Sequence, residues 1–385
     1  MQHTVHRRAH PSEGPTCRLV AVGDLMLSGE VARRHRPGPG PVRMFDEVAL
    51  ILRSGDIVFG NLETPLCNPP VARTLFRGHP GMAPALAAAG FNVLSLANNH
   101  ILEYGPDGLR ESARALAESG IAVLGAGEGQ DAARRPLIII RNGLRVGLIG
   151  LGRTLQAQKQ PNAPGFVEWD EDLAVRSLRE LRGSVDIVVV SIHIGYMWID
   201  YPSQAFKQAA DHLIAEGAHV VLMHHAHVLQ GYLAEGGRLA IYNLGNFIAD
   251  IYEGETGVTP VPDRQLESAI FLIDLDRGGV VQVSAVPIVT TPDLTVIVAP
   301  DERASRIVER LERIAREIRS GEYLAGFARQ RAELNTADSL AWLLFHLKRG
   351  HWRDLGASLR RARLEHVGML ARYATRSLET LWKRL

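Results

Sequence analysis

The sequence is short of the residues and patterns on which several classes of protein depend. Only two cysteines occur among 385 residues, which excludes a disulfide framework and a cysteine-based metal cluster. No apolar run approaches the roughly 18 residues that a membrane-spanning helix needs, and the polar, basic N-terminus lacks the apolar stretch of a signal peptide. The formal net charge is only +1, so composition gives no argument for a nucleic-acid partner. We therefore expect a cytoplasmic protein with no nucleic-acid or membrane signal.

Two common catalytic signatures are missing as well. The sequence contains no G-x-x-x-x-G-K-[ST] phosphate loop and no G-x-S-x-G nucleophile elbow. The glycine-rich segment GAGEG (125–129) lacks the G-x-G-x-x-G pattern of dinucleotide-binding proteins. The sequence therefore gives no support for a P-loop nucleotide-binding protein, an α/β-hydrolase with a nucleophile elbow, or a dinucleotide-binding protein.

What is present is an alternation of strand-like and helix-like segments. Apolar runs at 17–25, 56–63 and 91–100 alternate with segments of helical spacing, and 105–120 carries the Pro near its start and the Gly at its end that are typical of a helix. Unbroken Val, Ile and Leu runs favour strands covered on both faces. Asn142-Gly143 and Gly278-Gly279 indicate hairpins. The pattern predicts a layered α/β core, with helices outside the sheets.

The chain is predicted to divide into three parts. Residues 1–16 are expected to form a flexible N-terminal tail, and residues 17–299 the α/β core. After Pro300 the strand-like runs stop, so residues 300–385 are predicted to form an all-helical extension rich in Arg and Leu. We interpret its Arg-rich C-terminus as the solvated face of helices, with contact to phosphate or an acidic partner as the alternative.

Polar residues follow the ends of five apolar runs. They are Asp24, Glu63 with Asn61, Asn99-His100, His193, and the pair His225 and His227. Open α/β sheets bind ligands at the carboxyl ends of their strands, so we expect these side chains to converge. Taken singly, each residue has an ordinary interpretation as a turn former, a surface carboxylate or a core histidine. The repetition of this placement after five apolar runs is what indicates a site. In addition, residues i and i+2 of an extended chain lie on the same face, so His225 and His227 can point into one site.

Carboxylate, amide and imidazole groups in this number predict a site for one or two divalent ions. Such ligands suit Mn, Fe, Zn or Ni. Two ions that share a carboxylate would need about six to eight protein ligands, which is roughly the number available, and together they would activate a water molecule against a phosphoryl group. The other histidines, among them His212 and His219, have no partner pattern, and we interpret them as structural or solvated.

Six motifs occur in a recognisable order: VGDLML (22–27), FGNLETPL (59–66), LANNHILEYGPDGL (96–109), HIGYMWIDYPSQ (193–204), GAHVVLMHHAHVLQG (217–231) and IYNLGNF (241–247). Together they resemble the CapA family, which is associated with poly-γ-glutamate capsule synthesis and belongs to the calcineurin-like metallophosphoesterase superfamily. The resemblance spans about residues 17–290 and implies a four-layer α-β-β-α sandwich with its site at the strand ends.

The resemblance also implies roles for individual residues. Metal ligation is expected of Asp24, Glu63, Asn99, His193, His225 and His227. Among these, Glu63 is expected to bridge two ions, with Asn61 beside it. The catalytic position is Asn99-His100, where His100 assists the leaving group, and Asn246 lies in the LGNF motif of the family.

Three methionines depart from the pattern of the family. Met26 stands where a typical phosphoesterase has the histidine of Asp-x-His, which implies that one metal site is weaker or absent. Met197 stands where the family often has Glu, and Met223 replaces the glycine before the H-x-H segment. These changes bear on substrate identity and on activity, but they leave the main polar set intact.

The leading hypothesis is a metal-dependent hydrolase of a phosphoester or related anionic substrate, polyglutamate-type compounds included, in capsule or poly-γ-glutamate biosynthesis. The alternative is a non-hydrolytic accessory protein that binds polyglutamate or capsule-synthesis partner proteins during synthesis and export. Hydrolysis of a γ-glutamyl amide would use the same metal site. A nuclease of the same superfamily is a fourth hypothesis, which the near-neutral charge disfavours.

Overall fold

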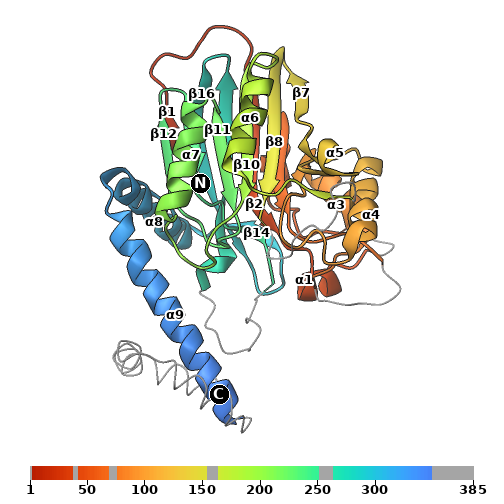
Figure 1. Cartoon of the computed structure of the whole chain (residues 1–385), viewed down its shortest axis with the longest axis vertical. Coiled ribbons are helices and arrows are strands. Elements are labelled where there is room, and N and C mark those ends of the chain that lie inside the picture. Colours follow the sequence, from red (N-terminus) through yellow and green to blue (C-terminus); the bar gives the residue numbers. More distant parts are fainter. Residues whose placement is uncertain (1, 38–41, 69–75, 154–163, 251–262, 349–385) are drawn as a thin grey trace. The chain divides into compact units, whose positions relative to one another are not determined.

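The computed structural model describes residues 2–37, 42–68, 76–153, 164–250 and 263–348, with side chains as far as Thr336 (Figure 1). The chain forms two compact units. The first runs to Asp250 and resumes from Asp263 to Tyr323, and the second contains helix α9 (Tyr323–Lys348) beyond its first residue. None of the described helices is long and apolar enough to cross a membrane.

The larger sheet of the first unit has nine strands, in the order β1-β16-β15-β2-β3-β4-β5, with β14 beside β2 and β17 beside β16. Strands β2 to β5 and β14 are parallel, whereas β15 runs antiparallel to β2 and β16 antiparallel to β15. The strands are β1 (His3–Arg7), β2 (Cys17–Leu25), β3 (Ile57–Leu62), β4 (Val93–Ser95), β5 (Ala122–Leu124), β14 (Asn246–Ile248), β15 (Glu267–Asp276), β16 (Gly279–Thr290) and β17 (Val296–Val298).

A second sheet has six strands, in the order β12-β13-β11-β10-β8-β7. Its four central strands are parallel, and antiparallel strands close it at both edges. The strands are β7 (Leu137–Arg141), β8 (Leu144–Gly152), β10 (Ile187–His193), β11 (Val220–His224), β12 (Tyr232–Glu235) and β13 (Arg238–Ile241). A short ladder joins β6 (Ala126–Gly127) to β9 (Gly165–Phe166).

Two helices cover one face of the six-stranded sheet. Helix α6 packs on β8 and β10, and α7 packs on β11 and β13 (Figure 1). The helices of the first unit are α1 (Gly29–Arg34), α2 (Ala49–Leu52), α3 (Ala83–Ala89), α4 (Gly105–Glu118), α5 (Gln130–Arg134), α6 (Glu171–Arg182), α7 (Gln204–Ala215) and α8 (Asp301–Ser320), with 3₁₀ turns η1 (Pro80–Met82) and η2 (Asp263–Leu266). The helix predicted over 105–120 is confirmed as α4.

Alternating side chains of β2 enter two different apolar clusters. Leu19 and Ala21 pack between the two sheets, against residues of β8, β10 and β11. Val20 and Val22 pack on the opposite face, against residues of α3 and α4. The strand is thus buried on both faces, as its unbroken apolar run predicted. The mixed α/β class and both hairpins are confirmed, with Asn142 and Gly143 at positive φ between β7 and β8.

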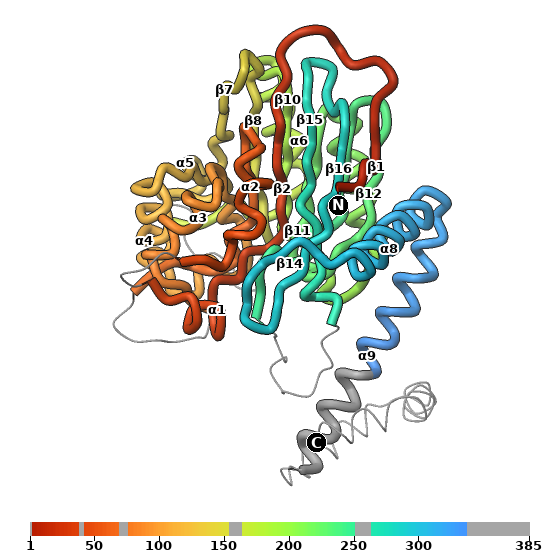
Figure 2. The backbone as a smooth tube through the Cα atoms, turned by 180° about the vertical axis from the view of Figure 1, so that it is seen from behind, coloured from red at the N-terminus to blue at the C-terminus, as the bar shows by residue number. Residues whose placement is uncertain are grey.

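The structure differs from the predicted domain limits at both ends of the core. Within the expected N-terminal tail, His3–Arg7 form β1, which pairs with β16, and the Tyr232 hydroxyl donates to the Val5 carbonyl at 3.1 Å. Helix α8, which was assigned to the extension, belongs to the first unit and contacts β12 and β16 (Figure 2). Its Arg303 and Arg310 donate to the two carboxylate oxygens of Glu267 at 2.9 and 2.6 Å. The Arg-rich stretch 349–385 lies outside the described residues.

His219 leads to a prediction about acid stability. Its Nδ1 accepts a hydrogen bond from the Val188 backbone N–H at 3.0 Å. Burial, with the charges of Arg238 and Arg182, lowers the pKa of His219 to about 4. An unfolded histidine titrates near 6.5, so the unfolded state binds more protons between these values. The free energy of unfolding is therefore expected to fall as pH drops through this window, by at most about 3 kcal/mol from this residue.

Urea unfolding of His219→Gln at pH 7 and pH 4.5 would measure this contribution. We expect its stability to depend less on pH than that of the wild type. His212→Gln is the control, because a hydrogen bond with Glu171 raises the pKa of His212, and its contribution is instead lost as pH rises. An unchanged pH dependence in His219→Gln would refute the assignment.

Candidate metal centre

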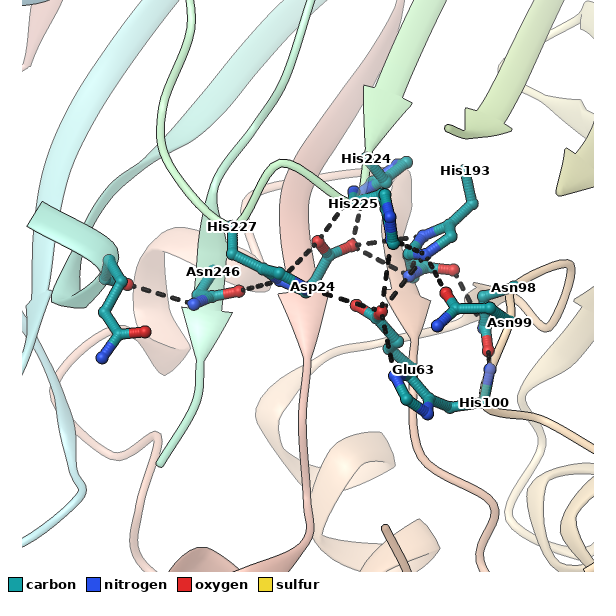
Figure 3. A network of polar contacts seen from close by, with 12 residues as sticks. Asp24, Glu63, Asn98, Asn99, His100, His193, His224, His225, His227 and Asn246 are labelled. Carbon is teal, nitrogen blue, oxygen red and sulfur yellow. Dashed lines mark hydrogen bonds and ion pairs between the residues drawn. The ribbon is translucent and has the colours of Figure 1, made fainter. Parts of the chain in front are cut away.

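The polar residues that follow the strands lie together at one edge of the two sheets (Figure 3). Asp24 comes from β2, His193 from the last position of β10, and the histidines 224–227 from the end of β11 and the loop beyond it. Because these strands are parallel within their sheets, their carboxyl ends meet at this edge. The predicted convergence is therefore seen in the structure for every site residue named from the sequence.

Two glycines allow the chain to approach this closely. A Cβ atom on Gly23, next to Asp24, would lie 1.9 Å from the Gly245 carbonyl oxygen, and the Asp24 backbone N–H donates to that same carbonyl at 2.9 Å. A Cβ atom on Gly152 would lie 2.2 Å from the Ala97 carbonyl oxygen. The absence of a side chain at Gly23 lets β2 approach the Gly245 backbone, and its absence at Gly152 brings the loop after β4, which carries Asn98 to His100, against β8.

The two carboxylates are fully buried but differ in their partners. Asp24 Oδ1 accepts from Asn61 Nδ2 at 2.9 Å and lies 3.1 Å from His224 Nδ1, while Oδ2 accepts from the His225 backbone N–H at 3.1 Å. Neither oxygen of Glu63 has a hydrogen-bond partner among the described residues. A buried carboxylate without hydrogen bonds is costly unless a cation accompanies it.

Imidazole nitrogens surround the Glu63 carboxylate. His193 Nε2, His227 Nε2 and His225 Nδ1 lie 3.2, 3.7 and 4.0 Å from Glu63 Oε1. His193 Nε2 also lies 2.7 Å from Asn99 Oδ1, and His227 Nδ1 lies 2.9 Å from Asn246 Oδ1. The predicted amides therefore lie directly beside the predicted histidines.

These atoms form two groups with the spacing of metal ligands. One contains Glu63, His193 and His225, and the other contains Asp24, Glu63 and His227. Within each group the ligand atoms lie within 4.8 Å of one another, and Glu63 belongs to both. Oxygen and imidazole donors fit a divalent ion such as Mn, Fe or Zn. The lack of hydrogen bonds to either oxygen of Glu63 supports the same fit.

Electrostatics at the site also suits a cation. Burial raises the pKa of Glu63, and the nearby Asp24 charge adds to this although the histidines oppose it. Burial alone would also raise the pKa of Asp24, but the hydrogen bond and charge of His224, with His193 and His227, hold it below its ordinary value. Burial lowers the pKa of His193 and His225 well below 6.5. Neutral imidazoles keep a lone pair available for a metal.

The backbone of the H-x-H segment is unusual. His225 and His227 have φ angles of 87° and 56°, in the left-handed region that non-glycine residues rarely adopt. The Trp198 backbone N–H donates to the Ala226 carbonyl at 2.8 Å and holds the segment in place. The two histidines do face one site, but through this left-handed geometry and not through the extended chain that the sequence suggested. Such strain is found most often at functional sites.

Three further residues belong to this network and were not assigned to it from sequence. His224 contacts Asp24, and Asn98 donates to the Leu62 carbonyl at 2.8 Å and to Asn61 Oδ1 at 3.2 Å. Glu103 Oε1 lies 3.0 Å from His100 Nδ1. Their sequence signals were the doubled His224-His225 and Asn98-Asn99, and an acidic residue three positions after His100.

The methionines that depart from the expected pattern occupy different surroundings. Met26 and Met223 are buried, whereas Met197 is 41% exposed in the loop after β10. Met26 offers no nitrogen or oxygen ligand, but the group of Asp24, Glu63 and His227 reaches three ligands without it. The expected weakening of one metal site therefore stays a prediction about affinity.

The chain is similar to proteins of capsule synthesis. The family described as "Bacterial capsule synthesis protein PGA_cap" matches residues 18–251. The "PGA biosynthesis protein CapA" of Bacillus subtilis (strain 168) is 27% identical over 277 residues, 69% of this chain and 70% of that protein. The "Capsule biosynthesis protein CapA" of Bacillus anthracis is 27% identical over 286 residues, 70% of this chain and 66% of that protein.

Two other proteins are similar to this chain over a smaller share of its length or at lower sequence identity. A "Probable polyglutamine synthesis accessory protein" of Mycobacterium tuberculosis (strain ATCC 25618 / H37Rv) is 31% identical over 223 residues, 52% of this chain and 57% of that protein. Among solved structures, a hypothetical protein from Thermus thermophilus is 18% identical, with a TM-score of 0.43, over 70% of this chain and 98% of that one.

Proposed function

The chain belongs to the bacterial capsule synthesis protein family PGA_cap, and on that premise we propose that it is a metal-dependent hydrolase of a phosphoester or related anionic substrate. The observation that carries the proposal is the pair of three-ligand groups that share Glu63, whose buried carboxylate has no hydrogen-bond partner among the described residues. We further propose that the two packed sheets with helices outside are the four-layer α-β-β-α sandwich of calcineurin-like phosphoesterases. The arrangement of α6 and α7 on the outer face of one sheet supports this.

The residues have distinct tasks in this proposal. Asp24, Glu63, His193, His225 and His227 would hold one or two divalent ions, with Asn99 as a further oxygen ligand. A divalent ion held there supplies positive charge that draws an anionic oxygen into the site and favours ionisation of a water molecule. Asn61 and His224 hold the Asp24 carboxylate in place, and Asn246 does the same for the His227 ring.

His100 is the group that would handle a proton. Its Nε2 lies 4.0 Å from Glu63 Oε1, at the border of the ligand groups, and its ring stacks on Phe76 with centroids 4.0 Å apart. A histidine so placed can donate a proton to a leaving oxygen, which contributes about 10²- to 10⁴-fold in comparable enzymes. Its side chain is 17% exposed, so it also remains accessible to a substrate.

A second candidate function is that of a non-hydrolytic accessory protein. It would bind polyglutamate or a capsule-synthesis partner protein through the same site. The name of the Mycobacterium tuberculosis relative favours it, and so does the exposed Met197, which has no ionisable group at a position where the family often has Glu. A wild-type protein that binds metal and polyglutamate, yet hydrolyses neither phosphoesters nor γ-glutamyl amides, would establish this alternative.

Metal content is the measurement that tests the proposal. Purified wild type is expected to hold about one or two transition-metal equivalents, and His225→Ala/His227→Ala, which removes one ligand from each group, is expected to hold almost none. His212→Ala is the matched control, because His212 is exposed and pairs with Glu171 outside the site. Phosphodiester hydrolysis should fall at least about 100-fold in the double variant, since even outer partners of metal ligands can be worth that much.

The outcome decides between the two functions. A double variant that turns over substrate normally would show the mechanism to be wrong. A wild type that takes up no manganese, zinc or iron would exclude the hydrolase and leave the accessory function.

A further inference from the structure

The His100 ring has a second polar contact, on the side away from the metal ligands. Its Nδ1 lies 3.0 Å from Glu103 Oε1, whereas its Nε2 lies 4.0 Å from Glu63 Oε1. Figure 3 shows His100 beside Glu63 and the loop that carries it. His100 and Glu103 are each 17% exposed, so their contact is largely shielded from solvent. The imidazole thus lies between two carboxylates that differ in role, one in both metal groups and one in neither.

The backbone places these two residues in contact. The Glu103 backbone N–H donates to the His100 carbonyl at 3.0 Å, which closes a turn directly before α4. Asn98 anchors the start of that turn, because its Oδ1 accepts from the backbone N–H groups of His100 and Ile101 at 3.2 and 3.0 Å. The contact is therefore built into the loop and does not depend on a flexible surface side chain.

The chemistry of the contact determines where the ring proton lies. An ionised carboxylate can only accept hydrogen bonds, so the Nδ1 that faces Glu103 must carry a proton. Among the described residues, the hydrogen bonds and ion pairs of the Glu103 side chain include no Lys or Arg. With Nδ1 protonated and the ring stacked on Phe76, the orientation of Nε2 toward the ligand groups is fixed.

We propose that Glu103 is the positioning residue for His100: it holds the Nδ1–H form of the ring so that Nε2 faces the leaving group. This inference rests on the hydrolase function proposed above. As the bond from phosphorus to the leaving oxygen breaks, the doubly protonated ring gives its Nε2 proton to that oxygen, while the water that bonds to phosphorus releases one proton to solvent. The ring becomes neutral and keeps its other proton on Nδ1, where Glu103 still accepts it. Glu103 itself neither gains nor loses a proton.

The first test reads the ring itself and needs no turnover. Nitrogen-15 NMR of histidine-labelled, metal-free protein at pH 8 reports which nitrogen of each neutral ring is protonated, and His100→Asn identifies the His100 signals. The wild type is expected to show protonated Nδ1 and unprotonated Nε2. Glu103→Gln, whose amide can donate as well as accept, should shift the population toward Nε2–H, and Glu103→Asp should keep part of the wild-type pattern. A His100 signal that is identical in wild type and Glu103→Gln would overturn the inference.

The second test uses two phosphodiesters that differ in leaving group. A nitrophenol leaves without a proton, whereas a simple alcohol needs one, so loss of a positioned acid affects the alkyl ester more. For Glu103→Gln we expect a fall in kcat of about 100-fold on the alkyl ester and less than about 5-fold on the nitrophenyl ester, with unchanged metal content. Glu118→Gln, which changes an exposed carboxylate on α4, is the control and should leave both rates unchanged.

The failures of the two proposals look different. Equal falls on both esters in Glu103→Gln would show a general structural role and contradict positioning. No turnover of either ester by the metal-loaded wild type would exclude the hydrolase function, while the NMR result would still show whether Glu103 fixes the ring.

Discussion

Replacement of Glu63 by glutamine is expected to abolish metal binding in both ligand groups at once. Glu63 is the one residue that both groups contain, and its carboxylate is buried without a hydrogen-bond partner among the described residues. An amide of the same shape keeps the packing but removes the negative charge and one of the two oxygen ligands. Metal content should fall from one or two equivalents to almost none, and phosphodiester hydrolysis by at least about 100-fold.

Asp24→Asn is the informative comparison. Asp24 belongs to only one group, so this variant should keep an ion at Glu63, His193 and His225 and lose at most one equivalent. Elemental analysis of the two variants beside the wild type measures the difference. Equal loss in both variants would mean that the groups are not separate sites, and an unchanged metal content in Glu63→Gln would remove Glu63 from the centre altogether.

Thermal unfolding gives a second readout of the same substitution. A ligand that binds only the folded state stabilises it by about 2.7 kcal/mol at a hundred times its Kd. Added manganese or zinc should therefore raise the Tm of the wild type by several degrees and leave the Tm of Glu63→Gln unchanged. A metal-dependent rise in both proteins would place the ion elsewhere.

Truncation of the chain after Pro300 is expected to prevent folding, whereas truncation after Tyr323 should leave the first unit intact. Helix α8 buries a stripe at the spacing of a helix face: Ala304, Ile307, Leu311, Ile314, Ala315 and Ile318. The loss of four buried Ile and Leu side chains forfeits roughly 6 to 12 kcal/mol, which is comparable to the whole stability of a typical domain. Removal of α8 also takes both arginine partners from Glu267.

Circular dichroism and metal content of the two truncated proteins test this expectation. The chain that ends after Tyr323 should bind metal like the full-length protein, because the first unit ends there and contains every ligand. If the chain that ends after Pro300 proved equally folded and bound metal equally well, the core of residues 17–299 predicted from the sequence would be correct and α8 would not be part of it.

The composition of the site could be predicted from the sequence because parallel strands end at a shared edge. Asp24, His193 and His225 each follow an apolar run, and strand polarity alone brings such residues together. Their exact partners could not be predicted. His224 and His225 are neighbours in the sequence, and the positive φ of His225 decides which of them faces Asp24 and which faces His193. A backbone angle of this kind arises from tertiary contacts such as that of Trp198 with Ala226.

The fold, like the site, could be predicted only in part from the sequence. Helical structure was predicted for residues 300–385 because the strand-like runs stop after Pro300, but that pattern does not say against which strands the apolar face of α8 packs. Strand β1 was missed because HTVHR has little apolar character, and its pairing with β16 depends on a strand more than 270 residues away, as the bond from Arg7 to Gln282 shows. Local pattern predicts an element, whereas long-range pairing assigns it to a domain.

The separation of the ligands along the chain has a consequence for the order of events in folding. The Asp24 carboxylate accepts a hydrogen bond from a backbone group 201 residues further on, so no short fragment contains a complete ligand group. Contacts between residues so far apart in the sequence form late and slowly, because closing the long loop between them costs entropy before the contacts contribute any favourable energy. An ion can then bind only a nearly native chain. Metal should therefore slow unfolding and leave the rate of refolding unchanged, as expected for interactions that are absent from the transition state.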